Sequence, residues 1–92
     1  MKDGYEVEIR GRKGTVCYNT EYNNEKYICV GFTDDGLKYE IYRYKFEDDK
    51  FLVSKVDNQE ELLPVMQIFL RQGLSEVGLP KAFQCLTDEE ND

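Results

Sequence analysis

The sequence predicts an α+β fold, in which a five-stranded antiparallel meander sheet that can curl toward a barrel is packed by one C-terminal helix. Residues 5–56 divide into five runs rich in β-branched and aromatic residues, and short turn sequences separate them. After Asp57 the apolar residues recur at helical spacing instead of alternating. Strands that follow one another through short turns pair as antiparallel neighbours.

The first two strands are expected at residues 5–10 and 15–22. Residues 5–10 alternate apolar and polar side chains, which is typical of a strand with one buried face. Gly11-Arg12-Lys13-Gly14 is predicted to be the turn between them. The alternative interpretation of Gly11–Gly14 as a nucleic-acid clamp is rejected, because that clamp requires flanking helices.

The third strand, 26–33, is expected to be the central one. It follows Asn23-Asn24, a pair suited to a tight turn. Its residues 27–30 are continuously apolar, which predicts that both of its faces are covered.

The fourth and fifth strands are predicted at 37–46 and 51–56, with a turn at 47–50. Asp34-Asp35-Gly36 favours a two-residue type I′ turn before the fourth strand. A calcium loop is excluded there because Gly31 supplies no side-chain ligand.

A helix is predicted from about residue 60 to 73, and the whole domain spans 1–84, followed by an acidic tail at 85–92. Asp57 and Glu60 have the spacing of a capping box. Pro64 is tolerable in the first turn of the helix, and Gly73 is a typical residue at a helix end. The apolar stripe of this helix consists of Leu62, Val65, Met66, Phe69 and Leu70.

Tyr42, Tyr44 and Phe46 form the candidate interface, because alternation places these three rings on one face of the fourth strand. They are expected to lie under the helix as core. If the helix covers the other face instead, they form an exposed patch and hence an interface. A base-stacking role is disfavoured, because Arg43 and Lys45 point to the opposite face.

The composition argues against an enzyme. The chain has no histidine, which excludes Ser-His-Asp and Cys-His catalysis and histidine-containing zinc sites. The acid pairs Asp48-Asp49 and Glu60-Glu61 lie at a turn and at a helix start, where carboxylates are usually structural. We therefore expect no catalytic residues, no metal site and no cofactor.

The cysteines and the apolar runs indicate a cytoplasmic protein. Cys17, Cys29 and Cys85 are an odd number at wide spacing, which favours reduced thiols over a disulfide framework, and a cross-strand bridge between Cys17 and Cys29 is the alternative. No signal peptide is visible, and no apolar run approaches the ~20 residues of a membrane span.

The order of these segments resembles the YrzB-like family of small acidic uncharacterised bacterial proteins. The stretch from about 16 to 70 carries the resemblance, through Glu25–Val30, Tyr39–Tyr44 and Phe51–Glu61. The chain departs from the family in its less acidic strands and in Pro64. The resemblance implies the same fold and a bacterial cytoplasmic setting, and it implies no activity.

Two functions follow as hypotheses. The first is a non-enzymatic module that binds an unknown protein through an exposed sheet face, with a possible homodimer through an open sheet edge. The second is an acidic mimic of nucleic acid that inhibits a nuclease or a DNA-binding protein, since residues 57–92 hold 8 acids against 2 bases and the whole chain carries −7. The same charge argues against direct binding of nucleic acid.

Overall fold

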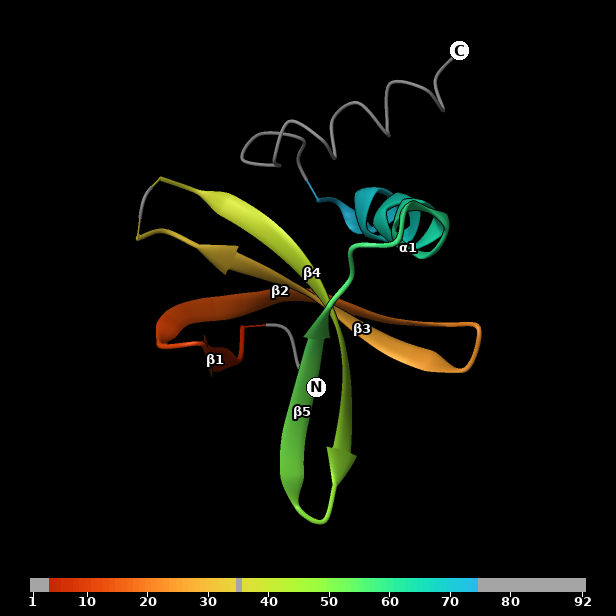
Figure 1. The fold of residues 1–92 in the computed structure, drawn as a ribbon. Coiled ribbons are helices and arrows are strands. Elements are labelled where there is room, and N and C mark those ends of the chain that lie inside the picture. Colours follow the sequence, from red (N-terminus) through yellow and green to blue (C-terminus); the bar gives the residue numbers. More distant parts are fainter. Residues whose placement is uncertain (1–3, 35, 75–92) are drawn as a thin grey trace.

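The computed structural model describes residues 4–34 and 36–74. Five strands form one antiparallel sheet in the order β1-β2-β3-β4-β5, and helix α1 follows and packs on one face (Figure 1). The predicted α+β class and meander order are confirmed. The predicted domain limit at 84, Cys85 and the predicted tail lie outside the described residues. The elements are β1 Glu6–Ile9, β2 Arg12–Tyr22, β3 Glu25–Phe32, β4 Lys38–Glu47, β5 Lys50–Lys55 and α1 Gln59–Gln72.

Three of the strand connections are two-residue turns whose residues both have positive φ. These pairs are Arg10-Gly11 (53° and 79°), Asn23-Asn24 (54° and 66°) and Asp48-Asp49 (52° and 62°). Such turns match the twist of the strands that they join, and Asn, Asp and Gly tolerate the conformation best. The turn predicted at Gly11–Gly14 is wrong by two residues, because Ile9 already pairs with Arg12 and β2 begins there.

The connection between β3 and β4 is longer than predicted. Phe32 pairs with Lys38, so more residues separate the two strands than the two of a tight hairpin turn. In this connection Asp34 forms an ion pair with Arg12 of β2, with the Nε–Oδ2 distance at 3.1 Å. Gly36 has a φ of 76°, which a glycine adopts without strain.

The sheet has a core on each face, and β3 contributes to both. Every residue from Tyr27 to Phe32 is buried, as its apolar run predicts. The helix-side core contains Tyr27, Cys29, Ile41, Val56, Leu62, Val65, Met66, Phe69 and Leu74. The inner core, on the opposite face, contains Val7, Ile9, Val16, Ile28, Val30, Phe32, Tyr42 and Tyr44.

The inner core is enclosed by the sheet itself. Val7 and Ile9 of β1 share this cluster with Tyr42 and Tyr44 of β4, although β1 and β4 are not neighbours in the sheet. The sheet must therefore curl. Figure 1 shows that the β2–β3 hairpin and the β4–β5 hairpin point in very different directions. Curling buries the second face without a second helix.

A β-bulge at Cys17 redirects β2 from one core to the other. Val16 pairs with Val30 and Tyr18 pairs with Cys29, so Cys17 is the additional residue. Val16 consequently packs in the inner core and Tyr18 against the helix-side core, where strict alternation would put both on one face. Cys29 is a buried thiol and forms no disulfide with Cys17.

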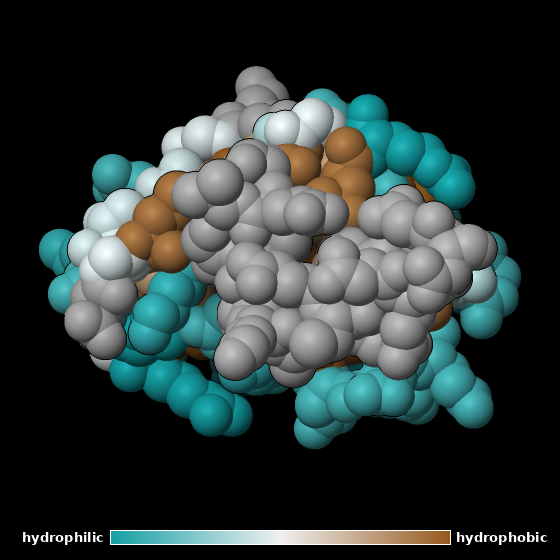
Figure 2. All heavy atoms as spheres, turned by 90° about the horizontal axis from the view of Figure 1, so that it is seen from above, coloured by the Kyte–Doolittle hydropathy of each residue, from teal (hydrophilic) through white to brown (hydrophobic). Residues whose placement is uncertain are grey.

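Helix α1 is capped at both ends. Asn58, and not the predicted Asp57, is the N-cap, because its side chain accepts a hydrogen bond of 2.9 Å from the Glu60 amide. Gly73 ends the helix as predicted, since its N–H donates to Leu70 and the next amide donates to Phe69. Pro64 lies beyond the first turn, contrary to the prediction. Seen from the helix side, hydrophilic residues make up most of the outline of the molecule (Figure 2).

Candidate interaction surface

The three rings of the predicted interface lie on the face of β4 opposite the helix. Tyr42 and Tyr44 belong to the inner core, whereas the helix packs on the face that holds Ile41. The expectation that the rings lie under the helix is therefore wrong. The physical reason is that both faces of β3 are apolar, and the curled sheet closes one of them without a helix.

Exposure rises steeply along this stripe. Tyr42 and Tyr44 are 6% and 5% exposed, but Phe46 is 63% exposed. The hairpin of β4 and β5 projects away from α1 and from the rest of the sheet (Figure 1). Its outer end consequently leaves the inner core, and the stripe reaches the surface only at Phe46.

Phe46 is part of a packed group of rings that we call the hairpin aromatic cluster, consisting of Tyr44, Phe46 and Phe51. The Phe46 ring lies 6.1 Å from the Tyr44 ring, edge to face, and 5.5 Å from the Phe51 ring. Tyr44 and Phe51 are 5.7 Å apart. Phe51 pairs directly with Phe46 across the strands, so each ring restrains its neighbour.

Phe51 was not among the residues predicted for the interface. The sequence does carry a signal for it, because a turn at Asp48-Asp49 places residue 51 opposite residue 46. The prediction that Arg43 points away from the tyrosine rings is confirmed. Its Nη1 donates to Glu61 of α1, at 2.7 Å, on the helix side of the sheet.

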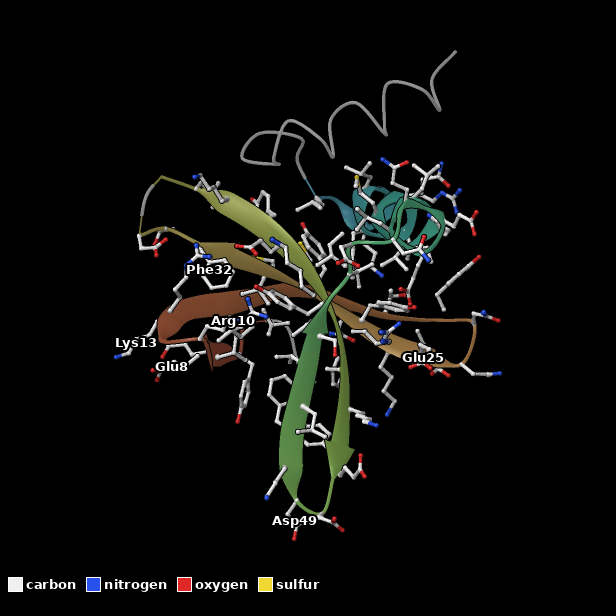
Figure 3. The ribbon with its side chains drawn as sticks, viewed as in Figure 1. Glu8, Arg10, Lys13, Glu25, Phe32 and Asp49 are labelled. Carbon is white, nitrogen blue, oxygen red and sulfur yellow. The ribbon has the colours of Figure 1, made fainter. Side chains whose placement is uncertain are left out.

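An acid lies on the same face as the buried tyrosines. Glu40 accepts hydrogen bonds from Arg12 Nη1 at 2.9 Å and from the Tyr42 hydroxyl at 3.1 Å, and Lys55 Nζ lies 3.2 Å away. Burial by itself raises the pKa of Glu40, but the hydrogen bonds from Arg12, Lys55 and Tyr42 outweigh it and lower the pKa. Burial beside Glu40 raises the pKa of Tyr42 to about 12. Arg12 also stacks 4.0 Å above the ring of Phe32, which Figure 3 labels.

Replacing Glu40 with glutamine is expected to destabilise the fold by about 1–2 kcal/mol at neutral pH, because Arg12 and Lys55 lose a half-buried carboxylate. The folded pKa of Glu40 is lowered, so its contribution is present above the pKa of an ordinary glutamate and is lost as the pH falls through the folded value. Urea unfolding at several pH values should therefore show the difference between Glu40→Gln and the parent shrinking in acid. Glu47→Gln removes an exposed partner of Lys45 and serves as the control, with a change near zero. Equal effects of the two substitutions would contradict this.

A shallow hollow of about 460 Å³ lies where the start of α1 meets β3 and β4. Glu61 accepts hydrogen bonds there from Tyr27 and Arg43. Burial, followed by the bond to Glu61, raises the pKa of Tyr27 to about 12, so the hydroxyl stays protonated and acts as a donor. Glu61 is thus held by two partners, which fits a structural role that ties the helix to the sheet.

A metal site is the next kind of site to consider among the residues that the structure describes. Among them, no group of three or more His, Cys, Asp and Glu side chains is arranged to hold a metal ion. The helix found within 4–34 and 36–74 is too short and too polar to cross a membrane.

Searches against protein-family models, curated proteins and solved structures find no match to this chain. The resemblance to the YrzB-like family stays a prediction.

Proposed function

We propose that this chain is a small non-enzymatic module, working in the cytoplasm, that binds another protein through the hairpin aromatic cluster. The observation that carries the proposal is the exposure of Phe46. A phenylalanine that is 63% exposed, on a strand where Tyr42 and Tyr44 are buried, leaves apolar surface uncovered. Aromatic residues are enriched in the buried centres of protein interfaces.

The packing of the cluster supports the same proposal. Tyr44 is buried and Phe51 is half-buried, and both lie within ring contact of Phe46. The exposed ring is thereby already ordered before a partner arrives. Binding would then cost little side-chain entropy, which is the usual advantage of rigid aromatic anchors.

Replacing Phe46 with alanine should abolish binding to the partner and leave the fold intact. The experiment captures proteins from the native lysate on the tagged parent chain, on Phe46→Ala and on Tyr5→Ala, at low and at high salt. Tyr5 is the matched control, because it is 59% exposed and immediately precedes β1, the strand at the other edge of the sheet. A partner held at high salt by the parent and by Tyr5→Ala, and lost with Phe46→Ala, is the expected result.

The two salt conditions separate this proposal from the acidic mimic. An interface centred on aromatic rings keeps its partner at high salt, whereas an acidic mimic releases a basic partner. Nucleases or DNA-binding proteins that elute with salt, and that bind Phe46→Ala as well as the parent, would replace the proposed function with that alternative.

A further inference from the structure

Strand β5 is an edge strand, and the turn before it determines which of its main-chain groups point away from β4. Within the described residues, β5 pairs with β4 alone. Glu47 and Lys50 flank a two-residue turn, and residues in that position exchange both main-chain hydrogen bonds. The bonds then alternate along the hairpin. The N–H and C=O groups of Phe51, Val53 and Lys55 therefore point away from β4.

The side chains of β5 offer apolar surface on both faces. Phe51 and Val53 pack against the inner core, and Leu52 on the opposite face is 42% exposed. A strand that adds to this edge must therefore be extended and apolar on both of its own faces. The sequence of β5 has this pattern itself, so a second copy satisfies the requirement.

We propose that two copies of this chain associate through their β5 strands, antiparallel, with Leu52 opposite Leu52 of the second copy. This register places the outward groups of Phe51 opposite those of Val53 of the second copy, so that both strands form main-chain hydrogen bonds. The proposal deepens the proposed function, on which it rests, by naming a second copy as one protein that the hairpin binds.

Charge complementarity selects this register. Asp49, labelled at the tip of the hairpin in Figure 3, falls beside Lys55 of the second copy, and the twofold axis repeats the pair. Centring the pair on Val53 instead would place Asp49 beside Asp57 of the second copy, which brings two carboxylates of like charge together. The preferred register also matches Phe51 with Val53, an aromatic and β-branched pair that stabilises sheets.

The other edges of the sheet fit a second copy less well. Strand β1 has four residues, and it carries Glu6 and Glu8 side by side on its exposed face. The outer part of β2 lies against α1, where the Gln72 side chain donates to the Asn19 carbonyl at 3.5 Å. Within 4–34 and 36–74, β5 with six residues is a longer edge strand than β1 with four, and no helix packs against its edge.

The dimer should be weak and should depend on concentration. A contact between two six-residue strands buries less than the ~1,200 Å² at the lower limit of stable complexes. Sedimentation velocity across the micromolar to millimolar range is expected to show a reversible equilibrium of monomer and dimer.

Charge reversal at the twofold axis tests the register. Leu52→Glu and Leu52→Lys should each be monomeric, because each places like charges directly opposite one another. An equimolar mixture of the two variants should dimerise again, at least as tightly as the parent. Leu37→Glu is the matched control, since Leu37 is an exposed leucine (44%) that immediately precedes β4, far from the tip of the hairpin, and this variant should dimerise like the parent. Far-UV circular dichroism checks that every variant is folded.

Two results would overturn the proposal. One is a parent chain that stays monomeric at millimolar concentration, and the other is a dimer that persists unchanged in Leu52→Glu. Neither result touches the proposed function, which depends on Phe46 of β4. If the chain is monomeric but still captures a partner through Phe46, the proposed dimer is wrong and the proposed function stands. If the chain dimerises but no partner depends on Phe46, the binding of other proteins is wrong and the dimer stands.

Discussion

Phe69→Ala is expected to destabilise the chain by about 3–5 kcal/mol, a large share of the ~5–15 kcal/mol that a domain usually has. Phe69 is fully buried in the helix-side core, and its ring lies 6.3 Å from that of Tyr18. Its carbonyl also accepts the hydrogen bond that closes the helix end. The truncation leaves a cavity between α1 and the sheet, and the hydrogen bonds that cap the two helix ends do not compensate for the lost packing. Urea unfolding followed by circular dichroism measures the loss.

Phe46→Ala is the matched control for this truncation, because it removes the same atoms from an exposed position. The ring of Phe46 is 63% exposed, so its loss should change the free energy of unfolding by less than about 1 kcal/mol. Similar losses for the two variants would show that the hairpin aromatic cluster supports the fold as strongly as the helix does. That outcome would contradict the separation between core and interface.

Gly14→Ala is expected to destabilise the chain by about 1–3 kcal/mol through overpacking. Gly14 is buried on β2, and a Cβ there would lie 2.5 Å from Cγ1 of Val30 and 2.9 Å from Cε1 of Phe32. Both neighbours are fully buried in the inner core and have no space into which to move. The melting temperature should fall by ~4–8 °C for each kcal/mol lost.

A double variant separates overpacking from a backbone effect. Val30→Ala removes the methyl group that the new Cβ meets, so Gly14→Ala combined with Val30→Ala should cost less than the sum of the single variants. Strict additivity would mean that the loss at Gly14 comes from the contact with Phe32 or from the strand backbone, and not from the contact with Val30.

The strands were predictable because each has a local cause. Alternation in β1, the apolar run of β3 and the Asn23-Asn24 pair each act within a few residues, and the structure has the corresponding elements. The bulge at Cys17 was not predictable in this way. It depends on the pairing of β2 with β3, and the sequence of β2 reads as an ordinary strand on either side of it.

The candidate site was predictable in part for the same reason. Alternation correctly groups Tyr42 with Tyr44 on one face, but which face the helix covers depends on contacts between distant segments. The partners of Glu40 were missed, although a signal exists. An acid that alternates with two tyrosines lies on a core face and therefore requires basic partners, which are Arg12 and Lys55.

The meander order has a consequence for the speed of folding. Each strand pairs with the next one along the chain, and three of the pairs meet across turns of two residues. The chain entropy lost in closing each hairpin is consequently small, and pairing can extend outward from the turns one residue at a time. A sheet of this kind has low contact order, so it should fold toward the fast end of the range for β-rich domains. The contacts between α1 and β2 join described segments that are far apart in sequence, and they are expected to form last.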